Sequence, residues 1–177
     1  MIDFTTLWDN GYTFEGFLAV STKHRGLWEG IYRVAHIPDW APAAVPAGVH
    51  RKLLVIAEDW CGDASNTVPI LAKLVDITPG LELRIVRRDE HPDLMDQYLT
   101  NGARSIPIVI ALDAELREIG HWGPRPAVLQ SWVMANRLTT PKTELYPLVR
   151  KWYARDHGEA TLREVLETAG LPVSKVA

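Results

Sequence analysis

The stretch from Lys52 to Ala57 reads KLLVIA, and it constrains the fold more than any other part of the chain. A near-continuous apolar run with a charged entry is typical of a strand that is covered on both faces. The apolar spacing that follows predicts a helix over 64–77, which Pro79-Gly80 stops. The alternating LELRIVR of 81–87 predicts a second strand, so this region begins as strand, helix, strand.

The next region adds a helix and then two strands. A helix is expected from Pro92, which suits a first helical turn, to Asn101-Gly102. Apolar residues then predict a strand over Pro107–Leu112, a returning antiparallel strand over Leu116–Gly120 and a helix over Pro124–Arg137. The order βαβ followed by ββα predicts an α/β fold, a mixed sheet flanked by helices on both faces.

Helical segments are also expected outside this region. Before it, apolar spacing predicts a helix over 13–24 and a second helix that carries Leu27 and Val34. The proline-rich PDWAPAAVPAG that follows is expected to be an ordered, irregular connection. After it, helices are predicted over 143–155 and 161–169, and Thr161-x-x-Glu164 has the spacing of a capping box.

We therefore expect a single domain of residues 1–177, a length that suits one hydrophobic core. Its core spans about 51–137, with an N-terminal helical extension at about 1–50 and a C-terminal helical extension at about 138–177. The sequence leaves open whether the extensions cap the core, cover a groove or form a dimer. A monomer and a homodimer are both retained.

Composition and charge exclude several classes of function. The formal net charge is −3 and there is no long Lys/Arg run, so neither nucleic acid nor an anionic membrane is an expected partner. No stretch approaches the ~20 apolar residues of a membrane span, and MIDFTTLWDN does not resemble a signal peptide. The histidines lack metal-ligand spacing, so no metal and no cofactor is expected.

The only cysteine of the chain is Cys61. A single cysteine excludes an intramolecular disulfide and a multi-cysteine zinc site, and it favours a reducing, cytoplasmic location. Cys61 lies in the segment EDWCGDA, directly after the buried strand and before the helix. The sulfur is therefore expected at a helix N-terminus, where free N–H groups and the helix dipole favour a thiolate. Gly62 would let a partner backbone approach, and Trp60 would shield one side of the sulfur.

Three acids near Cys61, namely Glu58, Asp59 and Asp63, are expected to act against the thiolate. One carboxylate at ~7 Å costs a thiolate on the order of 1 kcal/mol, whereas the helix terminus contributes roughly 0.3–2 kcal/mol in its favour. We therefore predict that the pKa of Cys61 is close to that of a free cysteine and that its reactivity at neutral pH is modest.

The segment Trp60-Cys61-Gly62-Asp63-Ala64 resembles Trp-Cys-Gly-Pro-Cys, the active-site segment of the thioredoxin superfamily. Pro69 falls where that family has a proline in its active-site helix. The segment 102–108, GARSIPI, is similar to the one that carries the family's cis-proline. The match extends over about 51–137 and is closest to bacterial thioredoxin family proteins with this monothiol segment. It implies a thioredoxin-like fold, Cys61 as nucleophile and a cis peptide bond before Pro107.

The resemblance also implies a substrate groove beside Cys61. In such a groove Pro107 would set the backbone of Ile106 beside the sulfur, ready to pair with an extended substrate segment. Trp60 and Trp122 would form the rim.

Three further residues are candidates for this groove, namely Arg104, Gly120 and His121. Gly120 corresponds to a groove glycine, and His121 next to it would activate the thiol if it reached Cys61; the alternative is a surface histidine without a role. Arg104 is expected either to be solvated, to offset the local acids or to hold a substrate carboxylate. Asp63 is expected to favour the helix N-terminus, with a general acid or base role as the alternative.

Three departures from the family pattern bear on activity. Ala64 stands in place of the second, resolving cysteine, Val55 in place of a buried aspartate on the central strand, and Asp63 in place of a proline. Cys61 is therefore able to form a mixed disulfide but requires an outside thiol to release it. We predict a monothiol thioredoxin-like protein whose partner is a protein or a low-molecular-weight thiol or disulfide.

Two other functions are retained. One is a non-catalytic binding module for proteins or peptides that keeps the groove and no longer uses the cysteine. The other is a role like that of monothiol glutaredoxins, in which the cysteine and glutathione hold an iron–sulfur cluster. The acids around Cys61 argue against this second alternative, because they would repel an anionic tripeptide.

Overall fold

The structure is a computed structural model of the chain, and it describes residues 1–174. Four helices precede the first strand: α1 (Phe4–Asn10), α2 (Phe14–Val20), α3 (Arg25–Val34) and α4 (Trp40–Ala43). The central region contains β1 (Arg51–Ala57), α5 (Gly62–Ile77), β2 (Leu81–Arg87), the short 3₁₀ helix η1 (Arg88–Glu90), α6 (Pro92–Met95), β3 (Ile108–Leu112), β4 (Glu118–Trp122) and α7 (Ala127–Asn136). Helices α8 (Lys142–Asp156) and α9 (Glu159–Thr168) follow.

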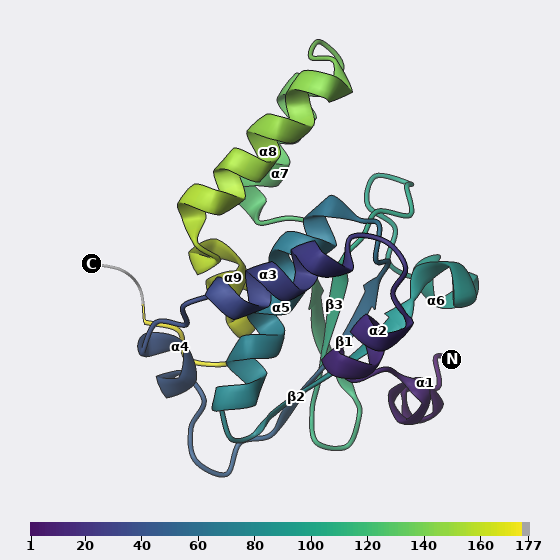
Figure 1. Cartoon of the computed structure of the whole chain (residues 1–177). Coiled ribbons are helices and arrows are strands. Elements are labelled where there is room, and N and C mark those ends of the chain that lie inside the picture. The colour runs from purple at the N-terminus through teal and green to yellow at the C-terminus, as the bar shows by residue number, and fades with distance from the viewer. Residues whose placement is uncertain (175–177) are drawn as a thin grey trace.

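The four strands form one mixed sheet in the order β2-β1-β3-β4. Strand β1 is parallel to β2 and antiparallel to β3, and β3 is antiparallel to β4. Helices lie on both sides of this sheet in Figure 1. The predicted α/β architecture, a mixed sheet flanked by helices, is therefore confirmed.

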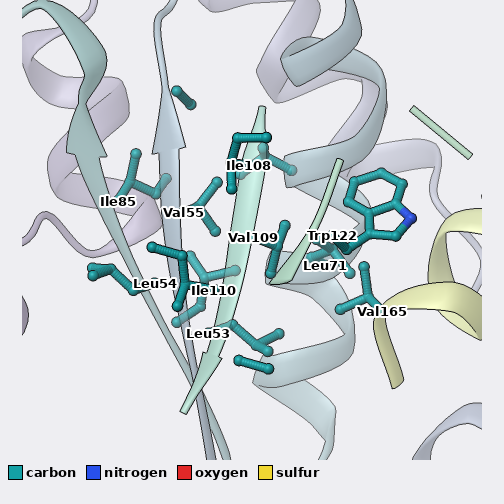
Figure 2. Close-up of a cluster of buried hydrophobic side chains, with 14 of the residues drawn as sticks. Leu53, Leu54, Val55, Leu71, Ile85, Ile108, Val109, Ile110, Trp122 and Val165 are labelled. Carbon is teal, nitrogen blue, oxygen red and sulfur yellow. The ribbon is translucent and has the colours of Figure 1, made fainter. Parts of the chain in front are cut away.

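The main core forms around the two central strands. From Leu53 to Ala57 every residue of β1 is buried, and so is all of β3. Side chains of these strands, of α5 and of α9 lie together in Figure 2, including Leu54, Ile110, Leu71 and Val165. Burial of this kind contributes about 25 cal/mol per Å² of apolar surface, so the central strands supply much of the stabilising free energy.

A second, smaller core lies outside the sheet. Helices α7 and α8 run side by side and extend away from the body of the molecule in Figure 1. Between them lies a separate cluster of buried side chains, Leu129, Val133, Leu145, Val149 and Tyr153. The hairpin is thus held together by its own apolar contacts, while its α8 side also packs against α5.

Several predicted boundaries were wrong by a few residues for local reasons. The strand expected over Leu116–Gly120 is β4, which begins at Glu118, because Asp113 accepts hydrogen bonds from two backbone N–H groups and extends the turn. The helix expected from Pro124 begins at Ala127. Pro126 disfavours the helical conformation for the residue before it, Arg125, and so delays the start of the helix.

The helix that was expected to start at Pro92 ends at Met95. Helix α1 was not predicted at all, although Asp3 caps it by accepting a hydrogen bond from the Thr6 N–H.

The predicted capping box at Thr161 was also wrong. Helix α9 begins earlier, after Gly158, and Thr161 is buried inside it. Glu164 instead accepts hydrogen bonds from the indole N–H of Trp122 and the backbone N–H of Ala127, so it ties α9 to β4 and α7. Of the predicted C-terminal extension, residues 175–177 lie outside the described residues.

Candidate functional site

Cys61 is the N-cap residue of α5, directly after the turn that leaves β1. Its sulfur accepts a hydrogen bond from the Ala64 N–H at 3.4 Å, and its thiol donates one to the Ile106 carbonyl oxygen at 3.4 Å. The residue is buried, with 8% of its surface exposed. The helix terminus predicted from the sequence is therefore formed, and one of its free N–H groups points at the sulfur.

Burial decides the pKa of this thiol. Loss of solvation, together with the charge of Asp63, raises the pKa of Cys61 to about 11. The hydrogen bond from Ala64 and the positive charge of Arg125 act in the opposite direction but do not compensate. The prediction of a pKa near that of a free cysteine was wrong, because it weighed the acids and the helix terminus but not the burial of the sulfur.

The two acids before Cys61 belong to a buried structural cluster. Glu58 accepts a hydrogen bond from Arg87 at 2.9 Å and one from the Asp89 N–H at 3.0 Å. Asp59 accepts two from the backbone N–H groups of Thr22 and Lys23, at 2.9 and 3.2 Å. Burial raises the pKa of Asp59, but these backbone bonds and the charge of Arg87 outweigh it and hold this pKa below its usual value.

The acid after Cys61 joins a different network. Arg125 pairs with both carboxylate oxygens of Asp63: its Nε lies 3.0 Å from Oδ1 and its Nη2 lies 2.8 Å from Oδ2. The Tyr153 hydroxyl donates to the same Oδ1 at 2.9 Å. Burial nevertheless raises the pKa of the Asp63 carboxyl, because it outweighs the Arg125 charge and the hydrogen bonds. This network links the first turn of α5 to the segment before α7 and to α8.

A cavity of about 380 Å³ opens beside Cys61, between α5, the start of α3 and α8. The residues that line it are His24, Leu27, Trp60, Cys61, Gly62, Asp63, Ser65, Asn66, Arg125, Tyr146, Val149 and Arg150. Four of the predicted site residues, Trp60 to Asp63, thus share one cavity. Ala64 is completely buried behind them.

The sequence did not identify the distant residues of this wall, including Arg125 and Arg150. Tyr153, which binds Asp63 from behind the wall, was missed as well, because it lies 90 residues away along the chain. No motif or spacing indicates that α8 returns to the first turn of α5, so local pattern carries no signal for these residues.

The proline segment lies on another side of the sulfur. The peptide bond between Ile106 and Pro107 is cis, and Ile106 is buried with its carbonyl oxygen facing the thiol. Gly123 packs so closely against Pro107 that a side chain there would overlap the Pro107 backbone. Gly120, expected in the groove, lies against the Thr168 backbone of α9 instead.

Three other predicted groove residues have partners away from the cavity. Arg104 forms a two-point ion pair with Asp96, with both distances 2.7 Å. The His121 ring lies 3.3 Å from Glu118 and against Tyr98, and Trp122 is buried with its indole N–H bound to Glu164. The structure therefore brings neither His121 nor Trp122 into the wall beside Cys61.

Within residues 1–174, no group of three or more His, Cys, Asp or Glu side chains is arranged to hold a metal ion. In the same range no helix has the length and apolar character needed to cross a membrane.

Comparisons with known proteins identify the family and the fold of the chain. A family model described as Thioredoxin matches residues 11–142. Among solved structures, the chain is similar to a protein of unknown function from Pseudomonas aeruginosa, with 22% identity, a TM-score of 0.77 and coverage of 96% of this chain and 98% of that one. An HIV epitope-scaffold is similar at 22% identity and a TM-score of 0.73, with the same coverage. At this identity the likeness concerns the fold. No curated protein matches the chain.

Proposed function

The chain belongs to the thioredoxin family, and from this premise we propose that Cys61 performs thiol–disulfide exchange as a single nucleophile with an external resolving thiol. The observation that carries the proposal is the position of the sulfur. It caps α5, accepts the Ala64 N–H and borders an open cavity. A thiolate formed there would keep this hydrogen bond and gain from the helix dipole.

The reaction requires no second cysteine in the chain. The Cys61 thiol first releases its proton to solvent, and the thiolate attacks one sulfur of a disulfide R–S–S–R. The new bond is Cys61–S–S–R, and the departing R–S⁻ takes up a proton. A second, external thiolate then attacks the R sulfur and restores the Cys61 thiolate. A reducing, cytoplasmic compartment would supply this thiol.

Burial makes the exchange slow at neutral pH. With a pKa of about 11, on the order of one Cys61 in ten thousand is a thiolate at pH 7. Arg125 is the cation that opposes this effect, since its charge lowers the pKa of Cys61. The proposed protein is therefore a monothiol exchanger that depends on a bound substrate to raise the local concentration of disulfide.

The same burial favours a second candidate function, a binding module for proteins or peptides in which the thiol is not used. A cysteine with 8% exposure and a raised pKa behaves as a small apolar side chain. On this alternative the cavity and the surface around Trp60 bind a partner, and Cys61 only fills space.

The two functions are separated by following the Cys61 adduct with oxidised glutathione by mass spectrometry between pH 6 and 10.5. The exchange function predicts one thiol-reversible adduct, absent in Cys61→Ser, whose rate rises about tenfold per pH unit below the pKa. Absence of the adduct at pH 10, with the fold intact by circular dichroism, would reject it. Capture of a partner that survives Cys61→Ser would then support the binding module.

A further inference from the structure

We infer that the cavity beside Cys61 binds a small anionic thiol or its disulfide, with a carboxylate a few bonds from the sulfur. This inference rests on the proposed exchange function and names its substrate class. It is carried by the cavity's size, by its charge and by the burial of Ile106 in the proline segment on another side of the sulfur.

The size of the cavity suits a small molecule. Its volume of about 380 Å³ lies at the lower end of the roughly 300–1,000 Å³ of ligand sites. Helix α8 forms one wall through Tyr146, Val149 and Arg150, which are spaced three and four residues apart and therefore share one face of the helix. The opposite wall is the start of α3, and Cys61 lies between the two.

The charge of the cavity favours an anion. Its lining contains two arginines and one aspartate, which leaves one positive charge when His24 is neutral. Asp63 and Arg125 satisfy each other, so the surplus charge belongs to Arg150. Among residues 1–174, Arg150 forms no ion pair, and its side chain is exposed at the cavity wall. A guanidinium in this position matches the two oxygens of a carboxylate.

The acids of EDWCGDA do not oppose such a ligand as the sequence suggested. Glu58 is bound to Arg87, and Asp59 is bound to the backbone N–H groups of Thr22 and Lys23. Neither lines the cavity, and Asp63 is held by Arg125. Each of these acids already has a partner within the protein, so on this proposal they do not prevent an anion from binding.

An extended peptide fits this site less well. Such a substrate would pair with the backbone beside Pro107, but Ile106 is only 6% exposed and its carbonyl oxygen accepts the Cys61 thiol. None of the proline segment lines the cavity, nor does β4. The cavity that borders the sulfur includes one face of α8 and no strand residue.

The bound reaction then follows a balanced path. With its carboxylate on Arg150, the disulfide presents one sulfur to the Cys61 thiolate, which has lost its proton to solvent. A Cys61–S–S–R bond forms, the original S–S bond breaks, and the second half leaves as a thiolate that is protonated by water. A second molecule of the small thiol is the co-reactant that regenerates Cys61.

The test uses three small disulfides with the full chain: anionic 3,3′-dithiodipropionate, neutral bis(2-hydroxyethyl) disulfide and cationic cystamine. Each adduct rate is divided by the rate of the same probe with a free cysteine peptide. We expect the anionic probe to react fastest, and Arg150→Gln to slow it about five- to tenfold while changing the neutral probe less than twofold. Arg155→Gln, on the same helix but outside the cavity, is the matched control.

Equal normalised rates for the three probes, or equal slowing of all probes by Arg150→Gln, would overturn the inference while leaving the exchange function in place. Faster reaction of a neutral peptide mixed disulfide than of 3,3′-dithiodipropionate would also overturn it. If no probe forms an adduct, the exchange function fails. NMR titration with 3-mercaptopropionate then tests, independently of any exchange, whether the cavity binds an anionic thiol. Binding that Arg150→Gln weakens supports the anionic site, and absence of binding at millimolar concentration rejects it.

Discussion

Asp59 and Asp63 stand two residues before and two residues after Cys61, and both side chains are largely buried, yet the pKa of one is lowered and that of the other is raised. Asp59 faces backbone N–H groups of the N-terminal region and the Arg87 guanidinium. Asp63 faces one arginine and one hydroxyl beside a cavity. The difference teaches that several fixed backbone donors can offset the loss of water around a carboxylate.

The two sides of Cys61 therefore have different roles. On the Asp59 side, the completely buried Trp28 donates its indole N–H to the Asp59 carbonyl oxygen at 3.0 Å and packs against Phe17. This side joins the N-terminal helices to the sheet. On the Asp63 side, the network ends at a cavity that is open to solvent, so a ligand can reach it. We expect the first side to govern stability and the second to govern reactivity.

The largest expected effect is on the structural side. Asp59→Ala removes the acceptor of two backbone N–H groups and one partner of the partly buried Arg87, so we expect a loss of about 2–4 kcal/mol in the free energy of unfolding. Urea unfolding followed by circular dichroism measures it. The exposed Asp9→Ala is the control and should change stability by less than about 0.5 kcal/mol. A loss below about 1 kcal/mol for Asp59→Ala would contradict the expectation that the Asp59 side of Cys61 governs stability.

On the cavity side, Tyr153→Phe removes the hydrogen bond to Asp63 at 2.9 Å. The carboxylate keeps Arg125, so we expect a smaller loss of about 1–2 kcal/mol in the free energy of unfolding. Tyr146→Phe, the same change at an exposed tyrosine on the same helix, is the matched control and should have little effect. If the two variants are equally stable, the Tyr153 bond does not hold α8 to α5.

The thiol between the two sides makes stability depend on alkaline pH. Its folded pKa of about 11 lies above the ordinary value of 9.0, so the stabilisation is complete below pH 9 and is lost as pH rises toward 11. We expect the free energy of unfolding to fall by about 1 kcal/mol from this group between pH 9 and 10. Subtracting the same curve for Cys61→Ser isolates the thiol. Identical slopes for both proteins would contradict the raised pKa.

The smallest expected effect is on the reactivity of Cys61, and it compares the two aspartates directly. Asp63→Asn removes a negative charge that raises the pKa of Cys61, and we expect this pKa to fall by less than about one unit. Iodoacetamide alkylation at pH 8 would then be a few times faster. Asp59→Asn is the counterpart two residues before the cysteine and should leave the rate unchanged, since Arg87 and the backbone already neutralise that charge. Equal acceleration by both variants would show that the two acids act on the sulfur alike.

The local sequence predicted more of the fold than of the site. Strand β1 and helix α5 were found within one or two residues, because a buried strand and a helix stopped by Pro79-Gly80 leave local patterns. The start of β4 was misplaced by two residues, because the length of the turn before it depends on Asp113 side-chain hydrogen bonds, which periodicity does not report. In the site, Cys61 and its neighbours were identified, whereas Gly123, Arg125 and Arg150 were not.

By itself the sequence determined the order of strands and helices and the position of one cysteine at the start of a helix, because hydrophobic periodicity and helix-terminal chemistry act over a few residues. Only the tertiary structure decided what that cysteine experiences. The burial of its sulfur, the pairing of its three acids and the arginines of its cavity all depend on segments far apart in the chain. Loss of solvation and long-range charge pairing are properties of the packed molecule, and no local pattern encodes them.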